Sequence, residues 1–416
     1  MMAKSNPVTR RMTVALVLAM AALLLSGATG AQQRYPATNW ERLAAPEKAG
    51  WSAEKLQPAR DYAKSIETAG VMIVVGGRVL DEWGETATKF NVHSIRKSYL
   101  SALYGVHVAE GRIDLAKTMA DLGIDDNEPS LTPTEKQATV RMLLQARSGI
   151  YHPALYETES MKKARPARFS HEPGTFWYYN NWDFNALGII FERHVKNSLF
   201  REFQERIAAP IGMQDYSLDD MTYVTGPDSV YAAYPFRMTA RDMARFGLLF
   251  LRSGAWNGRQ IIPAAWVRES TTAYSDAGAS GGYGYLWWIA VNGRHLPGVN
   301  LPDGSYSARG AGGHYILVVP AYDLIVVHRV NTDISGNAVD GAQFGQLVRL
   351  ILAARRGNAF LGRQNPATGS GECPRCQRST PGLRRSFASG GASAKKRVDR
   401  AELPRHFRPF RRLVHP

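Results

Sequence analysis

Two strand-rich segments at opposite ends of a long body, residues 31–356, constrain the fold of this chain most. Near the start of the body, residues 71–83 form two apolar runs around Gly76-Gly77, the pattern of a β-hairpin with a two-residue turn. Near its end, residues 315–329 form two further apolar runs joined by a short turn. Because hairpin strands pair antiparallel, these segments predict one antiparallel sheet built from both ends of the body.

The residues between the two hairpins, from Gly111 to about Tyr234, have mostly helical and loop patterns. The sequence therefore predicts an α+β fold, an antiparallel sheet flanked by helices with an inserted, mainly helical lobe. We expect a functional site in the cleft between the lobes. The expected parts are an α/β lobe at about 40–110 and 235–356, a helical lobe at about 111–234, helices at 51–69, 238–251 (capped by Thr239) and 339–356, and a strand at 284–289.

The first 30 residues have the pattern of a secretory signal peptide. Lys4, Arg10 and Arg11 precede an apolar run, residues 14–25, that is too short to span a bilayer comfortably, and small residues follow it. We therefore expect residues 1–30 to be removed, a periplasmic or secreted protein, and no stable membrane span afterwards.

The basic residues are concentrated at the two ends of the chain. The net charge is +15, but residues 357–416 hold 13 Lys or Arg and only three Asp or Glu, and the signal adds three more cations. The body is therefore almost neutral, which argues against a nucleic-acid partner. Residues 357–416 lack an apolar period, so we expect a basic, disordered tail.

The two cysteines, Cys373 and Cys376, lie in this tail as Cys-Pro-Arg-Cys. A structural zinc site needs four ligands, and the chain has no second cysteine pair. We expect neither a metal nor another cofactor. The sequence does not fix an oligomeric state.

Ser94 lies between a short strand pattern, residues 90–92, and an apolar helix that begins beside it. Lys97 is three residues on, so it lies on the same helix face, where burial and the positive end of the helix dipole lower its pKa. Such a lysine can take the proton of a serine hydroxyl and activate it as a nucleophile. The Ser-x-x-Lys spacing also occurs at Ser52, Ser160 and Ser393, in polar or tail segments without the strand and the apolar helix.

Residues 173–181 contain two overlapping Tyr-x-Asn triplets, Tyr178/Asn180 and Tyr179/Asn181. A nearby lysine can lower the pKa of a phenol, which then accepts a serine proton, and an asparagine amide can hold the lysine or a substrate carbonyl. The alternative for the aromatic residues is packing in the helical lobe.

A glycine-rich run, residues 308–315, leads into the second hairpin. Glycines allow a substrate to approach a strand edge closely. The backbone N–H of His314 could then pair with that of Ser94 as an oxyanion hole, and the alternative is an ordinary bulged strand entry.

Taken together, these motifs resemble the serine hydrolases related to class C β-lactamases, penicillin-binding proteins, esterases and nylon-oligomer (6-aminohexanoate-dimer) hydrolases. The resemblance implies a β-lactamase/transpeptidase-like fold. It extends from about Ala44 to Arg356 and includes Ser94-x-x-Lys97, 111–115, 139–150, 210–213, 238–245 and 283–288.

The resemblance also selects among the site residues. In the family pattern, a proline and a glycine lie at fixed distances before and after the reactive tyrosine. Pro173 and Gly188 lie at those distances from Tyr179, which makes Asn181 its partner. The third family motif opens with Lys or His, but that register here gives Ala311-Gly312-Gly313. The missing cation favours an esterase or amidase over a β-lactamase.

The implied mechanism is acylation of Ser94 by an ester or amide, with Lys97 and Tyr179 sharing its proton. The N–H groups of Ser94 and His314 would stabilise the oxyanion, and Asn181, Ala311, Gly312 and Gly313 would contact a small-molecule or peptide-like substrate. Whether Lys97 or Tyr179 is the acylation base stays open.

Three alternatives remain. The first is β-lactamase, D-amino-acid peptidase or penicillin-binding activity, and the second is a non-catalytic peptidoglycan-binding or sensor protein on the same fold. The third is a Ser-His-Asp hydrolase, because residues 278–282 match Gly-x-Ser-x-Gly around Ser280. That motif needs a preceding strand and a following helix, whereas a strand pattern follows here.

Overall fold

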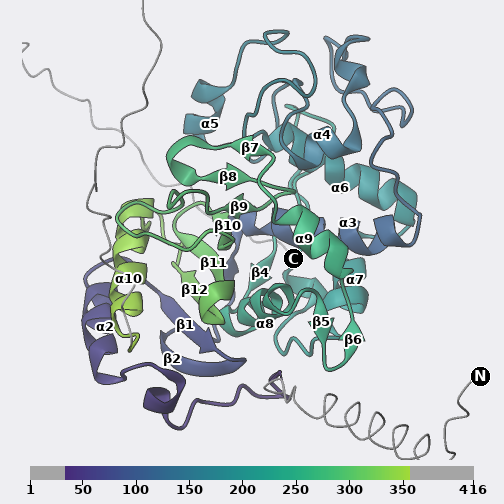
Figure 1. Ribbon diagram of the computed structural model, residues 1–416. Helices are drawn as coiled ribbons and strands as arrows, with labels where there is room; N and C mark the ends of the chain where they lie inside the picture. Colours follow the sequence, from purple (N-terminus) through teal and green to yellow (C-terminus); the bar gives the residue numbers. More distant parts are fainter. Residues whose placement is uncertain (1–32, 357–416) are drawn as a thin grey trace, which may run out of the picture. The chain divides into compact units, whose positions relative to one another are not determined.

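An eight-stranded antiparallel sheet forms the centre of the computed structural model, which describes residues 33–356 (Figure 1). The order β2-β1-β12-β11-β10-β9-β8-β7 places the first two strands beside the last. The strands are β1 (Gly70–Val75), β2 (Arg78–Gly84), β7 (Ser275–Asp276), β8 (Gly282–Tyr283), β9 (Trp288–Ile289), β10 (Tyr306–Gly310), β11 (His314–Val319) and β12 (Leu324–Arg329). The predicted signal peptide, the tail and both cysteines lie outside the described residues.

The pairing of β1 with β12 joins the two ends of the body in one sheet. Ile73 is opposite Val326 in this antiparallel pair, so the predicted sheet with contributions from both ends is confirmed. The β1–β2 turn uses Gly76 and Gly77 at φ values of +59° and +76°, a conformation that favours glycine.

Both faces of β1 are buried, and alternate residues belong to different cores. Met72 and Val74 pack on the face that α3 and α8 cover, whereas Val71 and Ile73 pack on the face that α2 and α10 cover (Figure 1). The sheet is therefore flanked by helices, as predicted. These four helices are α2 (Gln57–Lys64), α3 (Arg96–Ala109), α8 (Ala240–Leu251) and α10 (Gly341–Ala353).

Residues 111–234 contain short helices and loops, as the sequence predicts. The helices are α4 (Val140–Leu144), α5 (Glu159–Ala164), α6 (Asn181–Val195) and α7 (Leu199–Phe203). Outside this segment lie α9 (Ala264–Ser270) and two small sheets, β3 (Phe90–Asn91) with β4 (Arg237–Met238) and β5 (Ala255–Trp256) with β6 (Arg259–Gln260). None of the described helices is long and apolar enough to cross a membrane. The division into two lobes stays a prediction.

Two features near the sheet edge differ from expectation. Of the expected strand 284–289, only Trp288–Ile289 (β9) is a strand, and residues 284–287 form the turn between β8 and β9, in which the Gly284 N–H donates to the Trp287 carbonyl and Leu286 has a φ of +64°. In addition, β10 was not expected, because its buried residues include the polar Ser307 and lack a strand-like apolar alternation. The expected helix 51–69 is also shorter, a 3-10 turn (Glu54–Leu56) followed by α2.

Candidate active site

Ser94 lies in a 3-10 turn, His93–Ile95, between β3 and α3, as the strand-to-helix pattern predicts. The turn starts at His93 with a φ of +48°, and the Asn91 side chain accepts the His93 N–H at 2.9 Å. A positive φ costs energy for a residue other than glycine, so the surrounding contacts hold this turn in place. Ser94 thereby sits one turn before Lys97 on the same side of the helix start.

The Lys97 side chain is buried (1% exposed) and contacts three polar atoms. Its Nζ lies 3.0 Å from Ser94 Oγ, 2.7 Å from Tyr179 Oη and 2.8 Å from Asn181 Oδ1. The structure thus brings together three residues predicted as catalytic and the predicted asparagine. We call Ser94, Lys97, Tyr179 and Asn181 the lysine cluster.

Burial determines the protonation of the lysine cluster. It lowers the pKa of Lys97 well below its ordinary value, and the positive charge of Arg96 lowers it further. Burial also raises the pKa of Tyr179 to about 12, which outweighs the Ser94 hydroxyl and the positive Arg96 and Arg309. The expectation that the Tyr179 pKa is lowered was therefore wrong, because burial has the larger effect. Burial therefore favours the neutral amine of Lys97 and the neutral phenol of Tyr179.

The two tyrosines of the Tyr-x-Asn triplets have different contacts. Tyr179 reaches Lys97, whereas the Tyr178 hydroxyl donates to the Met161 carbonyl at 2.9 Å. Asn181 uses both ends of its amide, because Oδ1 accepts from Lys97 and Nδ2 donates to the Tyr156 carbonyl at 2.6 Å. Asn181 therefore orients the lysine, and its predicted contact with a substrate stays a prediction.

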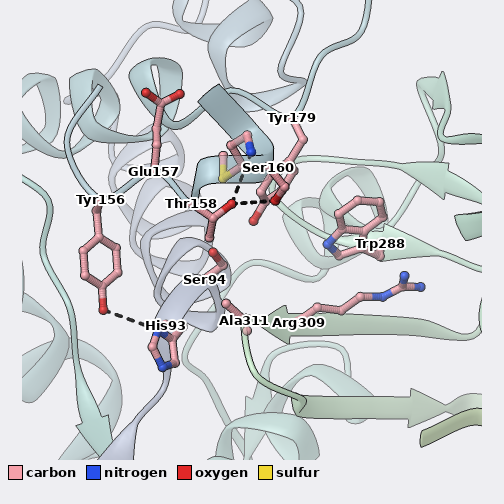
Figure 2. Close-up of a pocket in the computed structure, with 12 residues that line it drawn as sticks. His93, Ser94, Tyr156, Glu157, Thr158, Ser160, Tyr179, Trp288, Arg309 and Ala311 are labelled. Carbon is pink, nitrogen blue, oxygen red and sulfur yellow. Dashed lines mark hydrogen bonds between the residues drawn. The ribbon is translucent and has the colours of Figure 1, made fainter. Parts of the chain in front are cut away.

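A cavity of about 520 Å³ opens beside Ser94 and Tyr179 (Figure 2). The loop before α5 and the start of that helix form one side of it, and the sheet forms the other. Its walls are His93, Ser94, Tyr156, Glu157, Thr158, Ser160, Met161, Tyr179, Trp288, Arg309, Gly310 and Ala311.

The residues at the sheet side, Trp288, Arg309, Gly310 and Ala311, form what we call the strand wall. Ala311 lies next to Ser94 in Figure 2, consistent with its prediction as a cavity residue. Gly312, Gly313 and His314 do not belong to the cavity walls. A Cβ on Gly312 or Gly313 would instead meet Thr332 or Val339.

His314 begins β11, where it is paired with Gly310, and its ring lies 5.3 Å from the ring of His93. Arg329 Nε donates to His314 Nδ1 at 3.0 Å, so the buried ring belongs to a cluster beneath the cavity. By contrast, the backbone N–H groups of Ser94 and Ala311 donate to no other residue within 33–356.

Several cavity residues had no functional signal in the sequence. Arg309 belongs to the unexpected β10, and Tyr156 has a φ of +66° that no motif predicts. Of the large aromatic residues Tyr151, Trp177, Trp182, Trp287 and Trp288, only Trp288 lines the cavity.

A nucleophile elbow at Ser280 and a metal site are both absent from the described residues. Ser280 ends a 3-10 turn, Gly278–Ser280, and β8 follows it, so the helix that a Gly-x-Ser-x-Gly elbow requires is missing. Within 33–356, no three His, Cys, Asp or Glu side chains come together as metal ligands.

Comparisons with known proteins identify the family of the chain. The Beta-lactamase family model matches residues 12–349. An uncharacterised protein of Alkalihalophilus pseudofirmus is 22% identical over 302 residues, which cover 64% of this chain and 84% of that protein.

Solved structures share the fold at low sequence identity. A candidate 6-aminohexanoate-dimer hydrolase from Bacillus anthracis has a TM-score of 0.52 and 22% identity, covering 71% of this chain and 80% of that one. An octameric penicillin-binding protein homologue from Pyrococcus abyssi has a TM-score of 0.54 and 18% identity, covering 72% and 76%. EstCE1, a hydrolase with promiscuous acyltransferase activity, has a TM-score of 0.54 and 16% identity, covering 74% and 100%. The expected β-lactamase/transpeptidase-like fold is thereby confirmed, and the chain belongs to the β-lactamase family of hydrolases.

Proposed function

We propose that this protein is an exported serine hydrolase that cleaves an ester or amide through an acyl-enzyme on Ser94. One observation carries the proposal: a buried lysine amine lies 3.0 Å from the Ser94 hydroxyl and 2.7 Å from the Tyr179 phenol. Export rests on the signal-peptide pattern of residues 1–30 alone.

The three contacts of Lys97 suit a neutral amine, which has two N–H donors and one lone pair. Asn181 Oδ1 can only accept, so it takes one N–H. A second N–H can go to Tyr179 Oη, which leaves the lone pair for the Ser94 proton. We therefore assign Lys97 as the acylation base.

Tyr179 is suited to return the proton. With its pKa raised to about 12 by burial, it remains a phenol at neutral pH. As Lys97 gains the Ser94 proton, Tyr179 can pass its own proton to the leaving oxygen or nitrogen and recover one from Lys97. Ser94 Oγ bonds to the acyl carbon and the leaving-group bond breaks. Water then releases the acid, and its proton returns to Ser94.

The oxyanion is proposed to accept the N–H groups of Ser94 and Ala311. Both residues line the cavity, and neither N–H has an acceptor among the described residues. The sequence suggested His314 as the second donor, but His314 is not part of the cavity walls. Each donor of such a pair contributes about 3–4 kcal/mol to transition-state stabilisation.

A hydrolysis screen tests the proposal. The substrates are p-nitrophenyl esters, a chromogenic cephalosporin, D-amino-acid peptides and ω-amino-acid oligomers. We expect turnover of an ester or amide by the wild-type protein and its loss in Ser94→Ala. A protein that hydrolyses none of these, or a Ser94→Ala variant with the wild-type rate, would refute the proposal. The first result would favour a binding or sensor role.

A further inference from the structure

We infer that Arg309 forms a carboxylate-binding subsite, so that the preferred substrates are esters or amides that carry a carboxylate away from the scissile carbonyl. This inference rests on the proposed hydrolase function. Relatives carry a positive charge on the first residue of the third motif, where this chain has Ala311. In this chain, Arg309 on β10 would supply the positive charge instead.

The Arg309 guanidinium is held in place by neutral groups. Its Nε donates to Ser307 Oγ at 2.9 Å, and its Nη2 donates to His295 Nδ1 at 3.1 Å and to the His295 carbonyl at 2.9 Å. Nη1 makes no hydrogen bond with any residue in 33–356, and no Asp or Glu in that range pairs with Arg309. The guanidinium is thus oriented while its charge is left unneutralised.

His295 is suited to this orienting role. Its side chain is buried (1% exposed), and burial together with the neighbouring Arg309 lowers its pKa well below the usual value. The neutral ring accepts from Arg309 at Nδ1, which leaves Nε2–H to donate to Ser307 Oγ at 2.9 Å. His295 and Ser307 are therefore positioning residues behind Arg309.

The other charged or titratable side chains at the cavity leave Arg309 as its source of positive charge. Glu157 is paired with Arg165, whose Nη2 lies 2.5 Å from Glu157 Oε2. Burial lowers the pKa of His93 to about 4 and lowers the pKa of Lys97 well below its ordinary value. A substrate anion entering the cavity thus meets an uncompensated guanidinium in a partly desolvated place, where its charge is strongly felt.

The direction of the Arg309 side chain defines the kind of substrate. Arg309 runs along the strand wall beneath Trp288, with its guanidinium turned away from Ser94 (Figure 2). The guanidinium carbon lies 4.7 Å from the centre of the Trp288 ring, which fixes it further. A carboxylate bound there must be separated from the scissile carbonyl by a spacer, as in a dicarboxylic acid monoester. Trp288 would cover the apolar spacer.

Mono-p-nitrophenyl esters of adipic and suberic acid, each compared with its methyl-capped neutral counterpart, test the inference. The readout is the ratio of kcat/KM for the anionic ester to kcat/KM for the neutral one. We expect a preference for the anion in the wild type and a loss of about tenfold in this ratio for Arg309→Met. Arg309→Lys should retain part of it. Dividing by the neutral ester removes any general damage to the fold.

Arg349→Met is the matched control, because Arg349 is an exposed cation on α10 that, among residues 33–356, donates only to Gln346. It should leave the ratio unchanged. Equal ratios in the wild type and Arg309→Met, or an equal fall in Arg349→Met, would overturn the subsite.

If no ester is turned over, the proposed function fails, and binding decides the subsite separately. Calorimetry on Ser94→Ala with suberate monoanilide and its methyl ester should then show tighter binding of the anion. That difference should disappear in the Ser94→Ala, Arg309→Met double variant. Its persistence there, or its absence in Ser94→Ala, would overturn the inference.

Discussion

The lysine cluster and the strand wall face the same cavity but differ in how their polar groups are paired. In the lysine cluster, the Lys97 amine has three partners and the Asn181 amide uses both its oxygen and its nitrogen. In the strand wall, Arg309 Nη1 and the Ala311 N–H have no acceptor within the described residues.

This difference separates two tasks. A buried lysine with three hydrogen-bonded partners needs no substrate to complete its contacts, so it suits proton transfer. Unpaired donors at a cavity wall have groups to offer to a ligand, so they suit binding and oxyanion stabilisation. Changes in the lysine cluster should therefore alter the chemical step, and changes in the strand wall should alter the choice of substrate.

The largest expected effect is that of Ser94→Ala. Removing the nucleophile should lower ester kcat/KM by about 10⁴-fold or more. Lys97 keeps two of its three partners, so the thermal melt should stay close to that of the wild type. A variant with a substantial part of the wild-type rate would mean that another residue forms the covalent bond.

Tyr179→Phe should lower kcat by about 10²-fold to 10⁴-fold, the usual contribution of a positioned proton donor. Tyr178→Phe is its neighbouring control, because that hydroxyl donates to the Met161 carbonyl and not to Lys97. The control should keep a kcat near the wild-type value. Similar losses in both variants would show that packing, rather than proton transfer, accounts for the effect.

Asn181→Asp tests the protonation state of the lysine cluster. A carboxylate at the position of Oδ1, 2.8 Å from Nζ, favours the ammonium form, so it should raise the Lys97 pKa. Because the neutral amine is the active form, the acid limb of the kcat/KM profile should move to higher pH. Asn181→Ala removes an acceptor without adding charge, so it should move the limb downward or leave it in place. A limb that stays fixed in Asn181→Asp would assign it to a group other than Lys97.

The smallest expected effect belongs to the strand wall. Ala311→Lys adds an exposed cation beside Ser94, which should raise kcat/KM for cephalosporins relative to neutral esters by about fivefold. A carboxylate close to the scissile carbonyl should benefit most. No change in this ratio for a folded variant would mean that the side chain at position 311 does not reach the acyl group.

The contrast between the lysine cluster and the strand wall also explains which parts of the site the sequence could predict. Ser94 and Lys97 lie three residues apart at a helix start, so their proximity follows from local geometry. The Gly76-Gly77 hairpin is local in the same sense. Tyr179 was selected through the family pattern, and its contact with Lys97 agrees with that choice.

The strand wall depends on the pairing of strands that lie apart in the sequence, and a single sequence does not reveal this pairing. Position 311 was placed in the cavity, but His314, Gly312 and Gly313 turn elsewhere, because hairpin register decides which residues face the site. Arg309 gave no signal, since its partner His295 is 14 residues away and β10 resembles a polar loop. The Tyr179 pKa was misjudged because it depends on burial, which only the folded arrangement provides.

Covalent labelling of the folded wild-type protein by a fluorophosphonate, followed by peptide mass mapping, tests the central claim most directly. We expect one adduct on Ser94, absent in Ser94→Ala and formed much more slowly in Lys97→Met. An adduct on Ser280, or no adduct in a folded protein, would contradict the claim that the Lys97 amine activates Ser94.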